Sequence, residues 1–397
     1  MSKNQIIQNG WHQTKLKDLG VFTKGSGILK SQLSSSGNYA IRYGELYTRH
    51  HIQVKNIHSY ISDEVSQTAR KIGKGDILFA GSGETIDEIG KSAVYLKNDP
   101  CYAGGDIIVF SPKNADSLFL VHLLNMGEAR KKLRELGQGQ AVVHLYKSDL
   151  ENLSVTIPPL PEQRRIVSIL ETWDEAINEL MHKINLKQIE KDLLARKLVT
   201  GIVRLPNFSN KWSAKRLGDL LDYEQPTKYL VKDTEYNEAH SVPVLTAGKT
   251  FVLGYTDENT GIFTDLPVII FDDFTTANKF VTFPFKAKSS AMKMLKSKSN
   301  EIDLKFVFEK MQLLNFQPGE HKRYWISEYQ EQEIEIPELG EQRAIANVLS
   351  VVDEVIHLLK KKLANLQYQK DYLLNALMTG VIRTPENLTI IWKTTKI

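Results

Sequence analysis

Apolar side chains recur at alternating spacings of four and three residues in two long stretches of this chain. In the later stretch the seam positions are Ile345, Leu349, Val352, Ile356, Leu359, Leu363, Leu366, Leu373 and Leu377, interrupted by Lys370. In the earlier stretch they are Ile166, Leu170, Trp173, Ile177, Leu180, Ile184, Leu194 and Leu198, with Lys187 and Lys191 at two further seam positions. This spacing is typical of coiled coils. It predicts two helices of about 40 residues, each roughly 60 Å long.

The two seam lysines of the earlier stretch interrupt its apolar face. We expect the packing to loosen there, or the seam to shift onto Leu186, Ile189 and Leu193. Proline at or before each start and glycine after each end are typical helix boundaries. These boundary residues are Pro158, Pro159, Pro161 and Pro337 at the starts, and Gly201 and Gly380 at the ends.

The two helical stretches are copies of each other. Pro161-Glu162-Gln163-Arg164 returns 179 positions later as Gly340-Glu341-Gln342-Arg343, and the match continues without a gap to Arg204 and Arg383. In a weaker echo, Trp11, Leu16, Asp18 and Leu19 match Trp212, Leu217, Asp219 and Leu220. This duplication predicts two like globular domains, each followed by a long helix. We divide the chain into 1–160 (first domain), 161–206 (first helix and linker), 207–339 (second domain), 340–383 (second helix) and 384–397 (tail).

Each globular domain is predicted to be α+β and largely antiparallel. β-branched and aromatic runs broken by Gly, Asn and Asp predict short strands at 76–79, 106–110, 242–245 and 267–271. Short helices are expected at 117–136 and 304–314. The tail from Pro385 resembles the linker from Pro206, so we expect it to pack near the first domain. Like units and like helices related by a pseudo-twofold axis make the helix pair antiparallel, with a parallel hairpin as the alternative.

Composition narrows the class of protein. The 397 residues carry 51 Lys and Arg against 47 Asp and Glu, a net charge of +4, and one cysteine, Cys101. A single thiol makes neither an internal disulfide nor a cysteine-based zinc site. There is neither a long apolar run nor a signal-like start, so a cytoplasmic location is expected. Between residues 279 and 298 six lysines occur without a carboxylate, which predicts either a local positive surface or a solvated lysine face.

Three motifs in duplicate resemble the specificity subunit of type I restriction-modification systems. They are a proline followed by Glu-Gln-x-x-Ile at each helix start (Pro159 with 162–166, Pro337 with 341–345), Leu-x-Thr-Gly at each helix end (198–201 and 377–380), and the Trp-x4-Leu-x-Asp-Leu opening. The resemblance implies a DNA-binding protein without catalytic residues, cofactor or metal of its own. Each domain would be a target-recognition domain that reads one half of a bipartite, asymmetric DNA site. The helices would set the spacer between the half-sites, about one turn of the duplex.

The resemblance also implies partners. Two modification (methyltransferase) subunits, which would bind S-adenosylmethionine, would dock on the helices, and restriction (translocase and nuclease) subunits would join for cleavage. Exposed charge on the helices, at Arg164, Arg165, Lys360, Lys361 and Lys362, is compatible with docking or with simple solvation. No membrane partner is expected.

A self-contained DNA adenine methyltransferase or nuclease is the main alternative. Phe79-Ala-Gly-Ser-Gly83 resembles a cofactor turn and Asp99-Pro-Cys-Tyr102 a catalytic loop. They start only 20 residues apart, too few for the crossover that a Rossmann-like domain needs between them. Asp272-Asp273 followed by Lys279 is the nearest candidate for a nuclease metal site, although such carboxylates can instead accept hydrogen bonds from bases. A coiled-coil scaffold that never meets DNA, and the specificity subunit of a system with fused methylase and nuclease, also stay open.

Candidate DNA-contacting residues are chosen by chemistry, because recognition domains differ wherever their target sequences differ. Arginine reads guanine, amides read adenine, and lysine binds phosphates, so we select such side chains in polar or glycine-rich loops. In the first domain they are Arg42, Tyr43, Arg49, Gln138, Gln140, His144, Tyr146 and Lys147. In the second they are Thr246, Lys249, Tyr255, Asp272, Asp273, Thr275, Thr276, Lys288, Ser289, Ser290, His321, Lys322 and Arg323.

Overall fold

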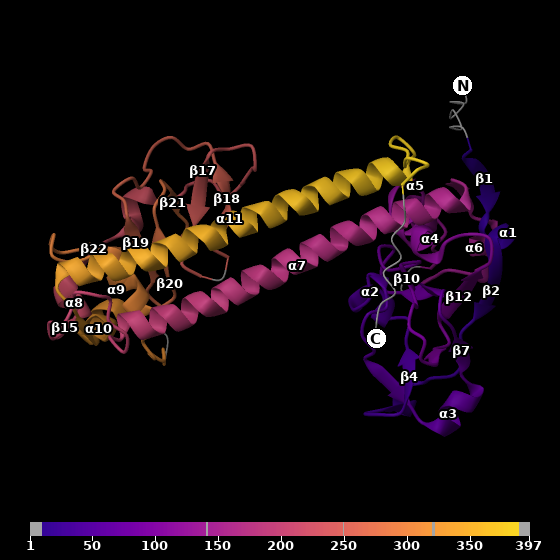
Figure 1. The fold of residues 1–397 in the computed structure, drawn as a ribbon, viewed down its shortest axis with the longest axis horizontal. Helices are drawn as coiled ribbons and strands as arrows, with labels where there is room; N and C mark the ends of the chain where they lie inside the picture. The colour runs from indigo at the N-terminus through magenta and orange to yellow at the C-terminus, as the bar shows by residue number, and fades with distance from the viewer. Residues whose placement is uncertain (1–9, 140–141, 249, 320–321, 389–397) are drawn as a thin grey trace. The chain divides into compact units, whose positions relative to one another are not determined.

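The structure is a computed structural model that describes residues 10–139, 142–248, 250–319 and 322–388. Two uninterrupted helices of 40 residues each dominate it, α7 (Leu160–Val199) and α11 (Leu339–Met378) (Figure 1). The chain divides into two compact units. Unit 1 combines residues up to Glu179 with those from Leu363 onwards, and unit 2 spans Leu180–Lys362. Each unit therefore holds one globular domain, half of α7 and half of α11.

The globular domain of unit 1 contains two five-stranded sheets. The first has the order β2 (Gly20–Lys24), β12 (Ile107–Pro112), β8 (Ile77–Ala80), β10 (Ser92–Val94) and β5 (Ile52–Gln53). The second has the order β3 (Leu33–Ser34), β6 (Ser59–Ile61), β4 (Asn38–Ile41), β11 (Cys101–Ala103) and β7 (Arg70–Ile72). Two ribbons pair β1 (His12–Lys15) with β14 (Ser154–Ile157) and β13 (Val143–His144) with β9 (Ser82–Gly83). The helices are α1 (Leu16–Leu19), α2 (Glu45–Thr48), α3 (Asp63–Thr68), α4 (Ser117–Leu124), α5 (Gly127–Glu135) and α6 (Lys147–Asn152), and Lys30–Gln32 forms a 3-10 turn.

The globular domain of unit 2 repeats the central sheet in a smaller form. The order β16 (Leu221–Glu224), β22 (Met292–Ser297), β19 (Val268–Asp272) and β20 (Asn278–Val281) corresponds to β2, β12, β8 and β10. A second sheet is β18 (Val252–Thr256), β17 (Val242–Leu245) and β21 (Lys286–Ala287), and β15 (Ser213–Arg216) pairs with β23 (Glu333–Ile336). The helices are α8 (Leu217–Leu220), α9 (Leu304–Met311) and α10 (Tyr324–Ser327), with 3-10 turns at Pro226–Tyr229 and Tyr329–Glu331.

The α+β class and the largely antiparallel sheets predicted from the sequence are confirmed. In the described residues, parallel pairing between strands joins β10 with β5, β11 with β4 and β17 with β21, and one isolated parallel bridge joins Leu230 and Ala287. The short helices expected at 117–136 and 304–314 are present, and two helices, α4 and α5, occupy the first stretch. The Asn125 amide donates to Val121 O and Ser92 O, and Gly127 follows with φ +53°. A side chain that binds the last turn and a left-handed glycine together end α4.

The two long helices pack antiparallel, as predicted, and a parallel pairing was wrong. In unit 1, Glu162 pairs with Arg383 and Asp174 with Lys370, so numbers rise on α7 while they fall on α11. In unit 2, Arg204 pairs with Glu341 and Lys191 with Asp353, in the same antiparallel sense. The start of each helix thus packs with the end of the other. In the described part of the chain, no helix is long and apolar enough to cross a membrane.

The predicted seam residues of α7 and α11 are all buried or half-buried, including Ile166, Leu170, Ile345 and Leu349 at the helix starts. The alternative register was wrong, because Leu186, Ile189 and Leu193 are about half exposed. The seam instead keeps its lysines. Lys191 lies 2.6 Å from Asp353, and Lys370 lies 2.6 Å from Asp174, so these two seam lysines each pair with an aspartate of the opposite helix. Lys187 instead pairs with Glu190 of its own helix. Polar pairs in an apolar seam stabilise one register over others.

The repeated Glu-Gln motif has a structural role in each unit. Glu341 is buried and accepts two hydrogen bonds of 2.6 Å from Arg204, which follows the end of the other helix. Glu162 binds Arg383 with the same two distances. The neighbouring Gln163 accepts from the Asp116 amide and donates to Pro158 O, and Gln342 does the same with Asp303 and Pro337. The motif therefore binds each helix start to the other helix's end and to the adjacent domain.

A charged network in unit 2 has a neutral counterpart in unit 1. Lys191 and Lys305 both contact Asp353 at 2.6 Å, and both also contact the buried Glu309 of α9. Burial would raise the pKa of Asp353, but hydrogen bonds from Lys191 and Lys305 lower it. In unit 1, His122 of α4 occupies the position that Glu309 of α9 occupies in unit 2. Burial and the charge of Lys370 lower the pKa of His122 to about 4, against the opposing effect of Asp174.

We expect unit 1 to lose stability in mild acid because His122 is neutral when folded. Between pH 6.5, the pKa of His122 in the unfolded chain, and about pH 4, its pKa in the folded chain, the unfolded chain binds a proton that the folded chain does not bind. By pH 4.5 this costs about 2 to 3 kcal/mol. Urea unfolding of His122→Leu at pH 7 and pH 4.5 should show that part of the pH dependence removed, whereas the exposed His12→Gln variant should keep it. Equal pH dependence in both variants would rule out His122 as its source.

Candidate nucleic-acid interface

The candidate residues of unit 2 gather where β19 ends and β22 begins. Asp272 Oδ1 accepts from the amides of Phe274 and Thr275, which closes a tight turn between β19 and β20. Thr276 in this turn has φ +58°, a left-handed conformation that is unusual for a β-branched residue. Backbone strain of this kind is concentrated at functional sites.

Two other segments join this turn through backbone hydrogen bonds, and a third joins one of those two. Asp273 N donates to Ala291 O, Tyr324 N donates to Asp273 O, and Lys288 N donates to Leu245 O. These bonds bring together segments whose candidate residues are Thr246, Asp272, Thr275, Thr276, Lys288, Ser289, Ser290, Lys322 and Arg323. Arg323, Thr275 and Ser290 are exposed. We call this set of loops the reading edge of unit 2.

Unit 1 has an equivalent reading edge, and matching hydrogen bonds define it. Gly81 N donates to Asp106 O as Asp273 N does to Ala291 O, and Leu145 N donates to Gly81 O as Tyr324 N does to Asp273 O. Gly90 N donates to Ala80 O as Thr276 N does to Asp272 O. By this correspondence, His144 occupies the position of Arg323. Gly90, with φ +65°, occupies that of the strained Thr276.

The structure brings most candidates of unit 1 to this edge. His144 Nδ1 lies 3.0 Å from Ser82 Oγ, and His144 exchanges two backbone hydrogen bonds with Gln138. Tyr146 and Lys147 follow directly and are exposed. Arg42 and Tyr43 lie next to the start of α2, where the Arg42 amide donates to the Glu45 carboxylate. Arg49 is exposed just after α2.

The loop 81–90 is held in place by contacts with α2 and α5 that were not predicted from the sequence. Burial raises the pKa of Tyr47, and the nearby Tyr43, Glu88 and Glu84 raise it further, so α2 lies beside this loop. Glu88 accepts from the amides of Glu84 and Thr85. Arg130 of α5 donates to Ile89 O and Asp87 O, and Arg134 pairs with Asp87. Arginines at 130 and 134 are one helical turn apart, which was the available sequence signal.

The lysine-rich segment of unit 2 is mostly occupied by internal contacts, so the expected local positive surface was largely wrong. Lys286 pairs with Glu258, Lys293 with Asp273, and Lys296 with Asp265 and Glu224. Lys298 donates to Gly218 O. Lys288 packs over the ring of Tyr236 at 5.7 Å and is half-buried. The missing carboxylates lie nearby in space although they are distant along the chain.

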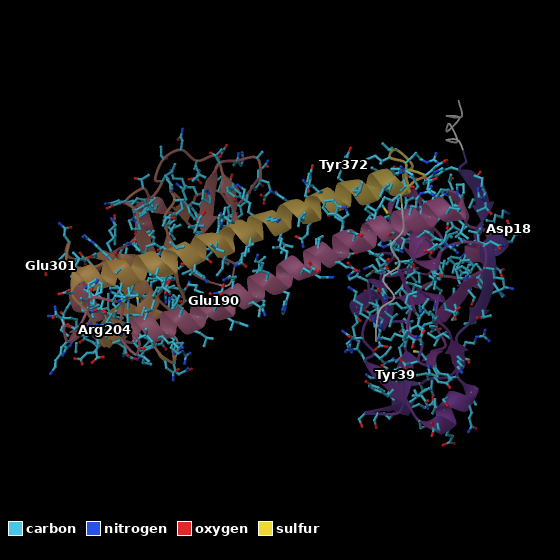
Figure 2. All side chains as sticks on the ribbon, viewed as in Figure 1. Asp18, Tyr39, Glu190, Arg204, Glu301 and Tyr372 are labelled. Carbon is cyan, nitrogen blue, oxygen red and sulfur yellow. The ribbon has the colours of Figure 1, made fainter. Side chains whose placement is uncertain are left out.

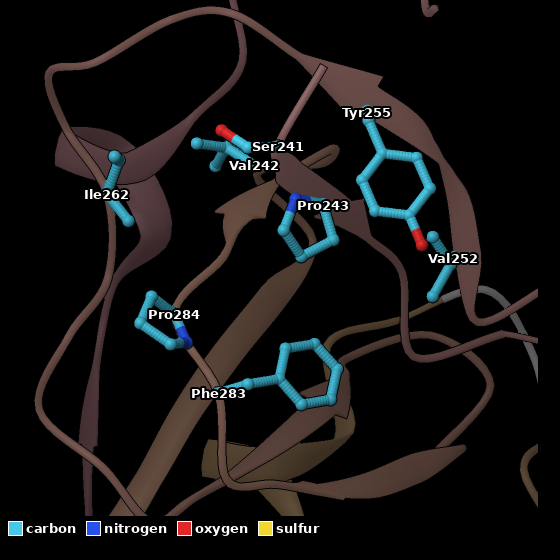
Figure 3. Close-up of a pocket in the computed structure, with 8 residues that line it drawn as sticks. All are labelled: Ser241, Val242, Pro243, Val252, Tyr255, Ile262, Phe283 and Pro284. Atoms are coloured by element: carbon cyan, nitrogen blue, oxygen red, sulfur yellow. The ribbon is translucent and has the colours of Figure 1, made fainter. Parts of the chain in front are cut away.

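Two candidates of unit 2 do not lie on the surface of the reading edge. Asp273 is 1% exposed, so its carboxylate is not available for a base contact in this structure. Tyr255 lies toward the other end of the β17–β18 hairpin from Thr246. There it lines an open apolar groove of about 440 Å³ with Val252 and Phe283 (Figure 3). Gln140, Lys249 and His321 lie outside the described residues.

The fragments that resembled catalytic motifs are strands. Cys101 and Tyr102 belong to β11, which pairs with β4 and β7, and Phe79 belongs to β8. Cys101 is buried, and burial raises its pKa to about 12. Within the described residues, no group of three or more His, Cys, Asp or Glu side chains could hold a metal ion. Asp272 uses its carboxylate in the turn, and Asp273 uses its carboxylate in the pair with Lys293.

The chain thus has two domains built on a duplicated scaffold, and each domain carries one reading edge. The two reading edges are equivalent in backbone but differ in side chains, which is the arrangement of a two-part recognition protein. A family described as the type I restriction modification DNA specificity domain matches residues 8–191 and again residues 209–368. The chain belongs to this family and contains two copies of its domain, so it is a DNA-recognition protein of type I restriction-modification.

Individual relatives agree with this assignment. The chain is 57% identical over 126 residues to the type I restriction enzyme EcoR124I/EcoR124II specificity subunit of Escherichia coli, a match that spans 30% of this chain and only 31% of that protein. It is 24% identical to the putative type I restriction enzyme MjaX specificity subunit of Methanocaldococcus jannaschii over 95% of each protein. The solved type I S subunit from M. genitalium is similar in fold, with a TM-score of 0.61 at 17% identity over 95% of this chain and 98% of that one.

Proposed function

We propose that this chain is the specificity subunit of a type I restriction-modification complex and reads a bipartite, asymmetric DNA sequence, one half with each domain. One observation carries the proposal: the two reading edges have the same backbone hydrogen bonds but different side chains. His144 in unit 1 corresponds to Arg323 in unit 2, and Gly81 corresponds to Asp273. The same backbone scaffold with different contacting side chains suits two half-sites that differ in sequence.

The complex would contain two modification subunits, which bind S-adenosylmethionine and methylate adenine, and restriction subunits that cleave. This chain would supply recognition without catalysis, would act in the cytoplasm, and its paired helices would set the spacer between the half-sites. The repeated Glu-Gln clamps and the seam Lys–Asp pairs support this, because they hold the pairing of the helices in one register.

A duplicated exposed face supports the docking of two identical partners on the helices. Ile189 and Leu193 on α7 are 48% and 58% exposed, and the residues 179 positions later, Tyr368 and Tyr372 on α11, are 76% and 63% exposed. Tyr372 is labelled in Figure 2. Each pair is spaced i, i+4, so its members share one side of a helix. Large apolar side chains exposed at matching places are typical of protein interfaces.

Leu193→Glu and Tyr372→Glu are each expected to remove one modification subunit from the complex. A buried carboxylate without a partner at an interface costs several kcal/mol, which is enough to release a subunit. Native mass spectrometry with a compatible modification subunit should change from two copies to one in each single variant and to none in the double variant. Asn365→Ala, at an exposed polar position of α11, should retain two copies. Retention of both copies in the double variant would contradict this docking face.

A genome-wide map of methylated adenines tests the proposed function itself. In cells that express the chain with a compatible modification subunit, methylation should fall on one split, asymmetric motif. The chain purified alone should not transfer methyl groups from S-adenosylmethionine, which separates it from a self-contained methyltransferase. Methylation without any sequence motif, or methyl transfer by the chain alone, would contradict the proposal.

Arg323 and Lys288 should differ in how they bind DNA. If Arg323 reads a guanine, Arg323→Ala costs about 1 to 3 kcal/mol of binding and relaxes one position of the target. Lys288→Ala, if Lys288 binds phosphate, should weaken binding to all sequences equally and flatten the dependence on salt. Competition binding at several salt concentrations measures both quantities. The same outcome for both variants would refute the distinction.

A further inference from the structure

A buried ion pair lies directly behind the reading edge of unit 2. Lys293 Nζ lies 3.1 Å from Asp273 Oδ2, and both side chains are 1% exposed. The ammonium group also packs over the ring of Tyr223 at 4.5 Å. Such pairs are costly to bury, and apolar replacements of similar size often stabilise a protein as well or better. The pair therefore calls for an explanation other than stability.

Asp273 connects three separate segments of the reading edge. Its backbone amide donates to Ala291 O, next to Ser289 and Ser290, and its backbone carbonyl accepts from Tyr324 N. Its Oδ1 accepts from Trp325 N at 2.9 Å, while Oδ2 faces Lys293. The side chain thus links the 272–277 turn to the segment that carries Arg323, and Lys293 holds the carboxylate in place from behind.

The pair is not part of the scaffold that the two domains share. In unit 1 the position of Asp273 is Gly81, by the matching backbone hydrogen bonds. A Cβ placed on Gly81 would lie 3.5 Å from Ile108 Cγ1, and Ile108 follows Asp106 by two residues as Lys293 follows Ala291. Unit 1 therefore has a glycine and an isoleucine where unit 2 has a buried salt bridge.

We propose that Asp273 and Lys293 are positioning residues that determine specificity for the half-site read by unit 2. The inference rests on the proposed function. Without the carboxylate, Trp325 N loses its acceptor, and the segment with Arg323 keeps only the backbone hydrogen bond from Tyr324 N to Asp273 O as its tie to the turn that holds the strained Thr276. Base recognition depends on donor and acceptor placement, so loosening these segments lowers discrimination between bases more than it lowers affinity for DNA in general.

The double variant Asp273→Gly with Lys293→Ile, which installs the residues of unit 1, separates positioning from stability. It leaves no unpaired buried charge, so its thermal stability should recover relative to Asp273→Asn alone. Discrimination against single-base changes in the second half-site should nevertheless fall roughly tenfold, the scale of one base contact. Discrimination in the first half-site should stay within about twofold, because unit 1 is untouched. Competition binding by the full chain with its modification subunits, against duplexes with single substitutions, measures this.

Glu341→Ala is the matched control, since it removes a buried carboxylate of unit 2 that contacts Arg204 and Trp212 rather than the reading edge. It should lower stability and leave discrimination in both half-sites unchanged. Wild-type discrimination in the double variant would overturn the positioning role and leave Asp273 and Lys293 as structural residues. Absence of sequence-specific binding by the wild-type chain would instead refute the proposed function, so the two failures are distinguishable.

Discussion

Replacing Glu341 by alanine is expected to lower the free energy of unfolding of unit 2 by about 2 to 3 kcal/mol, less than the loss from a fully buried ion pair because the Arg204 side chain is 28% exposed. The Glu341 side chain is 1% exposed. It accepts two hydrogen bonds from Arg204 and one of 3.1 Å from Trp212 Nε1. Arg204, labelled in Figure 2, also packs over the ring of Trp212. The substitution would leave the indole N–H without its acceptor and the guanidinium group with Asn210 O alone among its present acceptors.

Urea unfolding together with hydrogen exchange measures this loss and assigns it to a unit. Glu338→Ala is the control, because the neighbouring Glu338 is exposed and, among the described residues, its side chain accepts a hydrogen bond from Asn210 alone. Exposed contacts of that kind contribute about 1 kcal/mol or less. Glu162→Ala should destabilise unit 1 through Arg383 in the same way. Similar small losses for Glu341 and Glu338 would show that the clamp is not stabilising.

Replacing Asp353 by lysine is expected to cost about 3 kcal/mol or more in unit 2, because it converts a balanced network into a repulsive one. Lys191 and Lys305 each lie 2.6 Å from Asp353, and Glu309 alone would remain to balance three ammonium groups. The effect should be large at neutral pH. It should diminish as the pH falls through the lowered pKa of Asp353, since protonation removes the wild-type attraction that the variant lacks.

Asp174→Lys in unit 1 is the matched variant. Within the described residues, Asp174 forms its ion pair with Lys370 alone, and the nearby His122 is neutral at pH 7. We therefore expect a smaller loss. The exchange Asp174→Lys with Lys370→Asp should restore most of the stability, since it restores one opposite-charge pair. Chemical denaturation of the single and double variants measures both effects. A loss in unit 1 as large as in unit 2 would contradict the role of the additional charges on α9.

The duplication and the helices could be predicted because they depend on residues close together in sequence. Ile345, Leu349 and Val352 place apolar side chains on one side of a helix whatever the rest of the chain does. The reading edges could be predicted only in part. Arg323 and His144 were selected for their chemistry alone, and the backbone correspondence between them was invisible because the loops that carry them differ in length.

The predictions for charged residues that turned out to be buried or paired were wrong for a related reason. Asp273 looked like a ligand for a base because two adjacent carboxylates followed a predicted strand. The structure buries it against Lys293, 20 residues away, and ties it to Trp325, 52 residues away. The lysines of 279–298 looked solvated because no carboxylate lay within the segment, yet Glu258, Asp265 and Glu224 reach them from other strands and loops.

The amino-acid sequence by itself determined the repeat, the two helices and their seam, since helical periodicity and helix boundaries are local properties of the chain. Only the tertiary structure decided which charges face solvent and which are buried in pairs. Lys191 and Asp353 are far apart along the chain, and a lysine in a seam is unfavourable until the opposite helix supplies a carboxylate. Burial makes an ion pair depend on the geometry of every neighbour, and that geometry exists only once the two helices and the domain have packed together.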